Sequence, residues 1–121
     1  MTISKILVVD DASADRMNLQ KILVESGYQV TSAASGQEAL TKAADENPDL
    51  IFMDVVMDGM DGYQAVRKLK AEENSSSIPV VMVTSKNQPV DRIWAERKGA
   101  SGYVTKPYTP DQIHDAIAAL Q

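Results

Sequence analysis

The sequence predicts an α/β protein in which helices cover both faces of a parallel, five-stranded sheet. Short apolar runs without polar interruption lie at 6–9, 50–53 and 80–83, and they are typical of strands buried on both faces. Weaker strand candidates at 28–34 and 102–105 complete the sheet. Segments with helical periodicity follow each strand, and this alternation with short connections favours parallel pairing.

Five helices are expected from apolar spacing and from end signals. Gly27 and Gly99 are placed to end the first and fourth helices. Ser35 and Glu38 have the spacing of a capping box, and Thr109 precedes a proline at the start of the last helix. The apolar residues that share one face of each helix are, in order, Leu19, Ile22 and Leu23; Ala39, Leu40 and Ala43; Tyr63, Val66 and Leu69; Val90, Ile93 and Trp94; and Ile113, Ala116, Ile117 and Leu120.

Composition excludes several classes of function. The 121 residues suit one domain, expected over 1–121. Without cysteine the chain has no disulfides, thiol catalysis or iron–sulfur clusters, and its single histidine, His114, excludes a multi-histidine metal site. The net charge of -5 argues against nucleic acid as a partner. Because no signal peptide or membrane-length apolar run is present, we expect a cytoplasmic protein that does not enter a membrane.

Polar residues follow four of the predicted strands at their carboxyl ends, which meet at one edge of a parallel sheet. Carboxylates brought together there repel one another and need a cation, and Mg²⁺ is the natural one for oxygen ligands. Taken alone, Asp10 and Asp11 would equally fit a cap for the first helix. The residues gathered at this edge are Asp10 and Asp11, Asp54, Thr84 and Ser85, and Lys106.

One of three aspartates in the stretch "FMDVVMDGMDGYQ" is expected to be reactive. Magnesium beside a carboxylate, a lysine and a hydroxyl is what phosphoryl transfer requires. Asp54 directly follows a central buried strand, which would hold it rigidly, whereas Asp58 and Asp61 fall in the following loop. The sequence therefore predicts Asp54 as the nucleophile.

The whole chain resembles the receiver domain of bacterial two-component response regulators, in the single-domain style of the chemotaxis regulator. The resemblance rests on four motifs in order: "VVDD" at 8–11, "DVVM" at 54–57 continuing into "MDG" at 60–62, "VTS" at 83–85 and "TKP" at 105–107. It implies a flavodoxin-like (βα)5 fold with a doubly wound sheet of strand order 2-1-3-4-5, and no output domain.

The resemblance implies that Asp54 accepts a phosphoryl group from a sensor histidine kinase in a Mg²⁺-dependent reaction. Asp10, Asp11 and Asp54, with the backbone carbonyl of Val56, would bind the metal. The protein would not be an ordinary enzyme, because it would catalyse only its own phosphorylation and dephosphorylation.

The resemblance also assigns roles at the last two strands. Thr84 would hydrogen-bond the phosphoryl group and Lys106 would pair with it, while Tyr103 matches a switch aromatic that responds to Thr84. A static core position for Tyr103 fits the sequence equally well. The Lys106–Pro107 bond is typically cis in this family.

The same resemblance places the target-binding face on the fourth helix, the fifth strand (102–105) and the fifth helix. We expect a monomer or a weak dimer. The segment 85–107, with Trp94, further resembles regulators of type IV pilus and twitching-motility systems.

One departure from the family lies after the acceptor, where Asp58 and Gly59 replace the usual proline pattern. It predicts a more mobile loop and an altered Mg²⁺ affinity or dephosphorylation rate. Three alternatives stay open: a degenerate receiver that acts by binding alone, a Mg²⁺-dependent phosphatase, and a flavodoxin-like cofactor binder. The phosphatase usually needs a second acid where this chain has Val56, and the cofactor binder needs a glycine-rich loop where it has "DDASAD".

Overall fold

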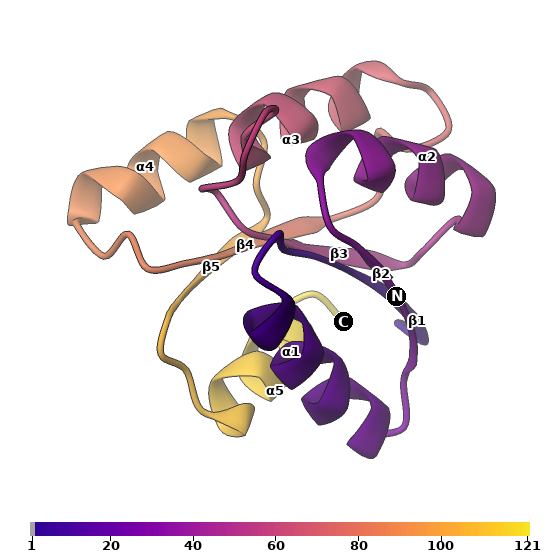
Figure 1. The fold of residues 1–121 in the computed structure, drawn as a ribbon, viewed down its shortest axis with the longest axis vertical. Helices are drawn as coiled ribbons and strands as arrows, with labels where there is room; N and C mark the ends of the chain where they lie inside the picture. The colour runs from indigo at the N-terminus through magenta and orange to yellow at the C-terminus, as the bar shows by residue number, and fades with distance from the viewer. Residues whose placement is uncertain (1) are drawn as a thin grey trace.

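The computed structural model describes residues 2–121 as a single alternation of strands and helices (Figure 1). The five strands are parallel in the order β2-β1-β3-β4-β5. The predicted fold class and strand order are therefore confirmed, and each predicted strand agrees to within one residue at either end. The elements are β1 (Lys5–Val9), α1 (Ser13–Glu25), β2 (Gln29–Ala33), α2 (Gly36–Glu46), β3 (Leu50–Met53), α3 (Gly62–Ala71), β4 (Val80–Thr84), α4 (Pro89–Arg97), β5 (Gly102–Thr105) and α5 (Pro110–Ala118).

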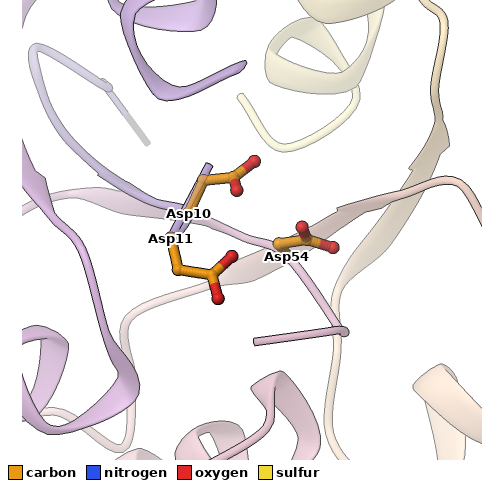
Figure 2. Close-up of side chains that lie close together, drawn as sticks. All are labelled: Asp10, Asp11 and Asp54. Carbon is orange, nitrogen blue, oxygen red and sulfur yellow. The ribbon is translucent and has the colours of Figure 1, made fainter. Parts of the chain in front are cut away.

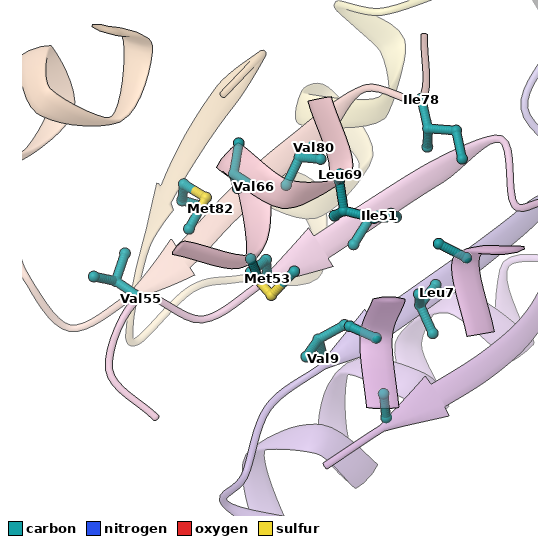
Figure 3. Close-up of a cluster of buried hydrophobic side chains, with 14 of the residues drawn as sticks. Leu7, Val9, Ile51, Met53, Val55, Val66, Leu69, Ile78, Val80 and Met82 are labelled. Carbon is teal, nitrogen blue, oxygen red and sulfur yellow. The ribbon is translucent and has the colours of Figure 1, made fainter. Parts of the chain in front are cut away.

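The sheet separates two apolar cores. Helices α1 and α5 cover one face, and α2, α3 and α4 cover the other (Figure 1). Alternate residues of the central strands enter alternate cores: Ile6 and Phe52 pack toward α1 and α5, while Leu7 and Met53 pack toward α2 and α3 (Figure 3). Because both faces are buried, β1, β3 and β4 need apolar residues at nearly every position, which explains their uninterrupted runs.

Most predicted helix ends are confirmed. Gly27 and Gly99 follow α1 and α4 with φ of 94° and 104°, a left-handed conformation that glycine adopts without strain. Thr109 caps α5 through a capping box with Gln112. Helix α5 ends at Ala118, so Leu120 of the predicted apolar stripe lies beyond the helix, although it still packs against the core.

The start of α2 differs from the predicted capping box. The Ser35 hydroxyl accepts a hydrogen bond from the Glu38 N–H at 3.1 Å, as the spacing predicts. The reciprocal bond, however, runs from the Ala34 N–H to the Glu38 carboxylate at 2.9 Å, one residue earlier than in a capping box. The glutamate therefore anchors the end of the preceding turn rather than the cap residue itself.

Helix α4 is only shallowly seated on the sheet. Ala95 is its one buried residue, and Val90, Ile93 and Trp94 are each about half exposed. The apolar stripe expected on this helix is thus largely open to solvent. None of the helices within residues 2–121 combines the length and the apolar character that a membrane crossing requires.

Candidate functional site

Three aspartate side chains meet at the carboxyl edge of the sheet (Figure 2). Parallel pairing continues one residue beyond the strands, with the Asp10 N–H donating to Ala33 O at 3.1 Å and the Asp54 N–H to Val9 O at 3.0 Å. These bonds fix the backbone of Asp10 and Asp54, whose side chains are almost buried. One carboxylate oxygen from each of Asp10, Asp11 and Asp54 lies within 4.8 Å of the other two. The predicted acidic cluster is therefore assembled by the sheet itself.

The two oxygens of the Asp10 carboxylate have different partners. Its Oδ1 accepts a hydrogen bond from the Ala12 N–H at 2.9 Å, just before α1 begins. Its Oδ2 accepts one from Lys106 Nζ at 2.7 Å. The N-cap of α1 is Ala12, and no side chain caps this helix, so the capping role considered for Asp10 and Asp11 is not observed.

Lys106 forms ion pairs with the carboxylates at this edge, while the Arg16 guanidinium donates to the Asp10 carbonyl at 2.7 Å. Its ammonium lies 2.7 Å from Asp10 Oδ2, 2.9 Å from Asp15 Oδ2 and 3.2 Å from Asp54 Oδ2. Burial by itself lowers the pKa of Lys106, but the hydrogen bonds to Asp10 and Asp15 and the charge of Asp54 outweigh it and raise the pKa overall. The lysine therefore stays protonated throughout the physiological range.

Asp54 carries an electrostatic penalty in spite of that lysine. Burial raises the pKa of the Asp54 carboxyl, and the nearby charge of Asp10 raises it further. The charge of Lys106 and a hydrogen bond from the Val56 N–H, at 3.3 Å from Asp54 Oδ1, oppose this rise without cancelling it. The ionised carboxylate is thus poorly solvated, and a cation beside it would relieve the penalty.

The other two aspartates of the opening stretch have different roles. The Asp58 side chain is exposed, and its backbone N–H donates to Asp11 Oδ2 at 2.9 Å. Asp61 caps α3, where Oδ1 accepts from the Gln64 N–H at 2.9 Å and the Gln64 side chain returns a bond to the Asp61 N–H at 3.0 Å. Of the three, only Asp54 belongs to the acidic cluster.

Thr84 and Tyr103 are joined through the backbone of one residue. Thr84 is fully buried at the end of β4, and its hydroxyl accepts a hydrogen bond from the Lys86 N–H at 3.4 Å. The Tyr103 hydroxyl donates to the carbonyl of the same Lys86 at 2.8 Å. Burial is the largest of the influences that raise the pKa of Tyr103, to about 12, so the hydroxyl remains a donor at neutral pH. The Lys106–Pro107 bond is cis, as expected.

The donor set of the cluster fits Mg²⁺. Its ligands are carboxylate oxygens alone, which suit a hard cation, and they are close enough to share one ion. Burial, and to a smaller extent the charge of Asp10, raise the pKa of Asp54 in spite of Lys106, so a cation bound here would stabilise the ionised carboxylate.

A family model for the response regulator receiver domain matches residues 6–118. The chain belongs to the response regulator receiver family. Protein PilH of Pseudomonas aeruginosa is 38% identical to this receiver over 117 residues, which are 97% of each chain. The receiver spans about half the length of other curated relatives that it matches.

Solved structures agree with the family and the fold. The chemotaxis protein CheY4 of Vibrio cholerae superimposes with a TM-score of 0.92 at 30% identity, covering 99% of this receiver and all of that chain. The receiver domain of the sensor histidine kinase PA1611 of Pseudomonas aeruginosa gives a TM-score of 0.88 at 28% identity, covering 98% and 97% of the two chains. That structure holds a magnesium ion in its active site cleft.

Sequence reasoning missed Asp15 in this receiver. The residue lies in the first turn of α1, and its carboxylate completes the contacts of Lys106. An acid in the first turn of a helix is common because it complements the helix dipole, so its position gave no sign of a distant partner. The sequence signal that could have found it is its place just beyond β1, at the edge where the other acids gather.

Proposed function

We propose that this receiver accepts a phosphoryl group from a sensor histidine kinase on Asp54, in a Mg²⁺-dependent reaction, and thereby switches a protein-binding face. The observation that carries the proposal is the setting of Asp54. Its carboxylate is nearly buried, belongs to a cluster of three carboxylates and lies 3.2 Å from the Lys106 ammonium. Receiver domains are signalling modules, and the activity proposed here is confined to self-modification.

The transfer replaces one bond to phosphorus by another. A carboxylate oxygen of Asp54 attacks in line, the P–N bond of the phosphohistidine breaks, and the released imidazole takes a proton from water. Lys106 would pair with the phosphoryl oxygens, and the Thr84 hydroxyl would turn from the Lys86 N–H to donate to them. An aspartyl phosphate then forms without further catalytic groups.

Asp10, Asp11 and the Val56 carbonyl would hold the metal together with Asp54. Bound there, Mg²⁺ would neutralise charge on the phosphoryl oxygens. Support comes from the carboxylate-only donor set of the cluster and from the magnesium in the related PA1611 domain. Asp10 is already oriented for this by its bond from the Ala12 N–H.

The shared contacts of Thr84 and Tyr103 suggest how the change spreads. If the Thr84 hydroxyl leaves the Lys86 N–H, the 84–86 turn loses one of its bonds, and Tyr103 is bound to the carbonyl of that same turn. Tyr103 also lies under Arg92 of α4, with 5.4 Å from the guanidinium carbon to the ring centroid. A rearrangement at Thr84 would therefore reach α4 through a short chain of contacts.

The target would dock on the face formed by α4, β5 and α5. Three large apolar side chains of α4, Val90, Ile93 and Trp94, are about half exposed. Because Trp94 is the single tryptophan, its fluorescence should report the switch directly. We expect its emission to change when beryllofluoride and Mg²⁺ are added, and Tyr103→Phe to diminish that change.

We further propose a pathway of the chemotaxis or twitching-motility kind, in the cytoplasm, with a monomeric or weakly dimeric regulator. The similarity to PilH over 97% of each chain supports this choice. The receiver would act either by docking on a target or by draining phosphoryl groups from a shared kinase.

The decisive experiment is intact mass after incubation with acetyl phosphate, with and without Mg²⁺. One phosphoryl adduct that requires both the metal and Asp54 is expected, and Asp54→Asn should show none. Beryllofluoride binding, measured in parallel, tests the same site if the phosphoryl adduct is too short-lived for mass spectrometry. If neither ligand engages wild-type Asp54, the chain is a degenerate receiver that acts by binding alone.

A further inference from the structure

The Lys106 ammonium has as many carboxylate partners as it has N–H donors. A protonated lysine has three N–H donors. The structure gives this ammonium three carboxylate partners, Asp10 at 2.7 Å, Asp15 at 2.9 Å and Asp54 at 3.2 Å. An incoming phosphoryl group can therefore reach Lys106 only by displacing one of these partners.

Asp15 differs from the other two partners. Asp10 and Asp54 belong to the carboxylate cluster that fits a cation, so a metal bound there would share their charge with Lys106. Asp15 is outside that cluster. Its side chain is about half exposed, on the first turn of α1, whereas Asp10 and Asp54 are nearly buried. Asp15 is thus the partner whose hold on the lysine a bound metal would relax least.

We infer that Asp15 is a positioning residue that holds the Lys106 ammonium at the mouth of the site and competes with the phosphoryl group for it. This inference rests on the proposed function, because the competing ligand is the phosphoryl group on Asp54. Asp15 is not a member of the carboxylate cluster, and its ion pair with Lys106 is the contact through which it would act. Its presence makes the phosphorylated state less favourable and its removal makes that state more favourable.

The test compares beryllofluoride affinity at saturating Mg²⁺, measured by calorimetry, for wild type and Asp15→Asn. An exposed ion pair is worth at most about a factor of five in an equilibrium constant, so the variant should bind up to about fivefold more tightly. Asp111→Asn is the matched control. Asp111 is also an acid in the first turn of a helix, and no ion pair involves it among residues 2–121. Its substitution should leave the affinity unchanged.

A double-mutant cycle with Lys106→Met shows whether Asp15 acts through its contact with Lys106 or through its charge at longer range. The effect of Asp15→Asn should vanish in the Lys106→Met background. If it persists there, Asp15 acts through its charge on the whole site and the inference is wrong. Unchanged or weaker binding by Asp15→Asn alone also overturns it.

A second readout applies even if Lys106→Met binds too weakly for the cycle. In ¹⁵N-lysine spectra of the metal-free protein, Asp15→Asn should shift the Lys106 ammonium resonance, and Asp111→Asn should not. An unmoved Lys106 resonance would overturn the inference. Failure of wild type to bind beryllofluoride would instead refute the proposed function, and this inference with it, so the two failures are distinguishable.

Discussion

Gly62 is the residue whose substitution should damage this receiver most directly, because α3 begins against the backbone of Asp54, the proposed acceptor. The Gly62 N–H donates to Val55 O at 2.9 Å. A Cβ at position 62 would lie 2.1 Å from the Asp54 carbonyl oxygen and 2.9 Å from Val55 Cα. Both are backbone atoms, so no side-chain rotation can relieve the overlap, and even the shortest ordinary contact, 3.4 Å, requires a displacement of about 1.3 Å from 2.1 Å.

The expected cost of Gly62→Ala follows from two opposing contributions. Steric overlap in a packed site typically costs about 1–3 kcal/mol. Replacing glycine by alanine in a helix returns about 0.5–1 kcal/mol. Taken at their midpoints, about 2 and about 0.75 kcal/mol, these contributions lower the free energy of unfolding by roughly 1 kcal/mol, and we expect Tm to fall by roughly 3–6 °C. Because displacement of a reacting group by about 1 Å can cost on the order of a hundredfold in rate, labelling of Asp54 by acetyl phosphate should also slow.

Gly36→Ala is the matched control, since Gly36 is likewise the first residue of a buried helix start. Its Cβ would come within 3.0–3.1 Å of the Met60 side chain, which is flexible and can move aside. Urea unfolding and acetyl phosphate labelling of both variants give the comparison. If Gly62→Ala matches Gly36→Ala in stability and labels at the wild-type rate, the close approach of α3 to Asp54 does not constrain the site.

Three further predictions follow from the acidic cluster and its loop. Because burial raises the pKa of Asp54, the ionised carboxylate destabilises the fold. In EDTA, Asp54→Asn should therefore raise the free energy of unfolding at neutral pH. Urea titrations should show that this increase in the free energy of unfolding becomes smaller as the pH falls. Mg²⁺ at about one hundred times its Kd should add about 2.7 kcal/mol to the stability of wild type. In thermal unfolding, Asp11→Asn should be stabilised less than wild type by Mg²⁺ at that concentration. Backbone order parameters from ¹⁵N relaxation should be lower for residues 56–60 than for β3, and equal values would count against a mobile loop.

The strands and the grouping of Asp54 with Asp10 were predictable because both depend on burial and chain order. Strands β1, β3 and β4 lie inside the sheet and must be apolar on both faces, which marks them without ambiguity. Their carboxyl ends share one edge in any parallel arrangement, so chain order alone predicts that Asp10 and Asp54 lie close together. The cluster of these two residues with Asp11 in the structure agrees with that prediction.

Other features depend on distances that periodicity does not encode. The helical spacing of Ile93 and Trp94 is the same whether a helix packs into the core or offers a docking surface, and here both side chains are about half exposed. The contact of Asp15 with Lys106 joins residues 91 positions apart in the sequence. The reciprocal bond of Glu38 moved by one residue because its flexible side chain can reach either neighbouring N–H. Such details follow from packing rather than from pattern.

The charges at the site determine how strongly phosphorylation of Asp54 should depend on a metal ion. Asp10, Asp11, Asp15 and Asp54 bring four carboxylates to one edge, and Lys106 is the one basic side chain paired with them within residues 2–121. A phosphoryl group adds close to two further negative charges at neutral pH. One ammonium cannot offset this excess, and Lys106 is already shared among three of the acids. A divalent cation is therefore needed before the anion arrives, so phosphorylation of Asp54 should be ordered, with Mg²⁺ first.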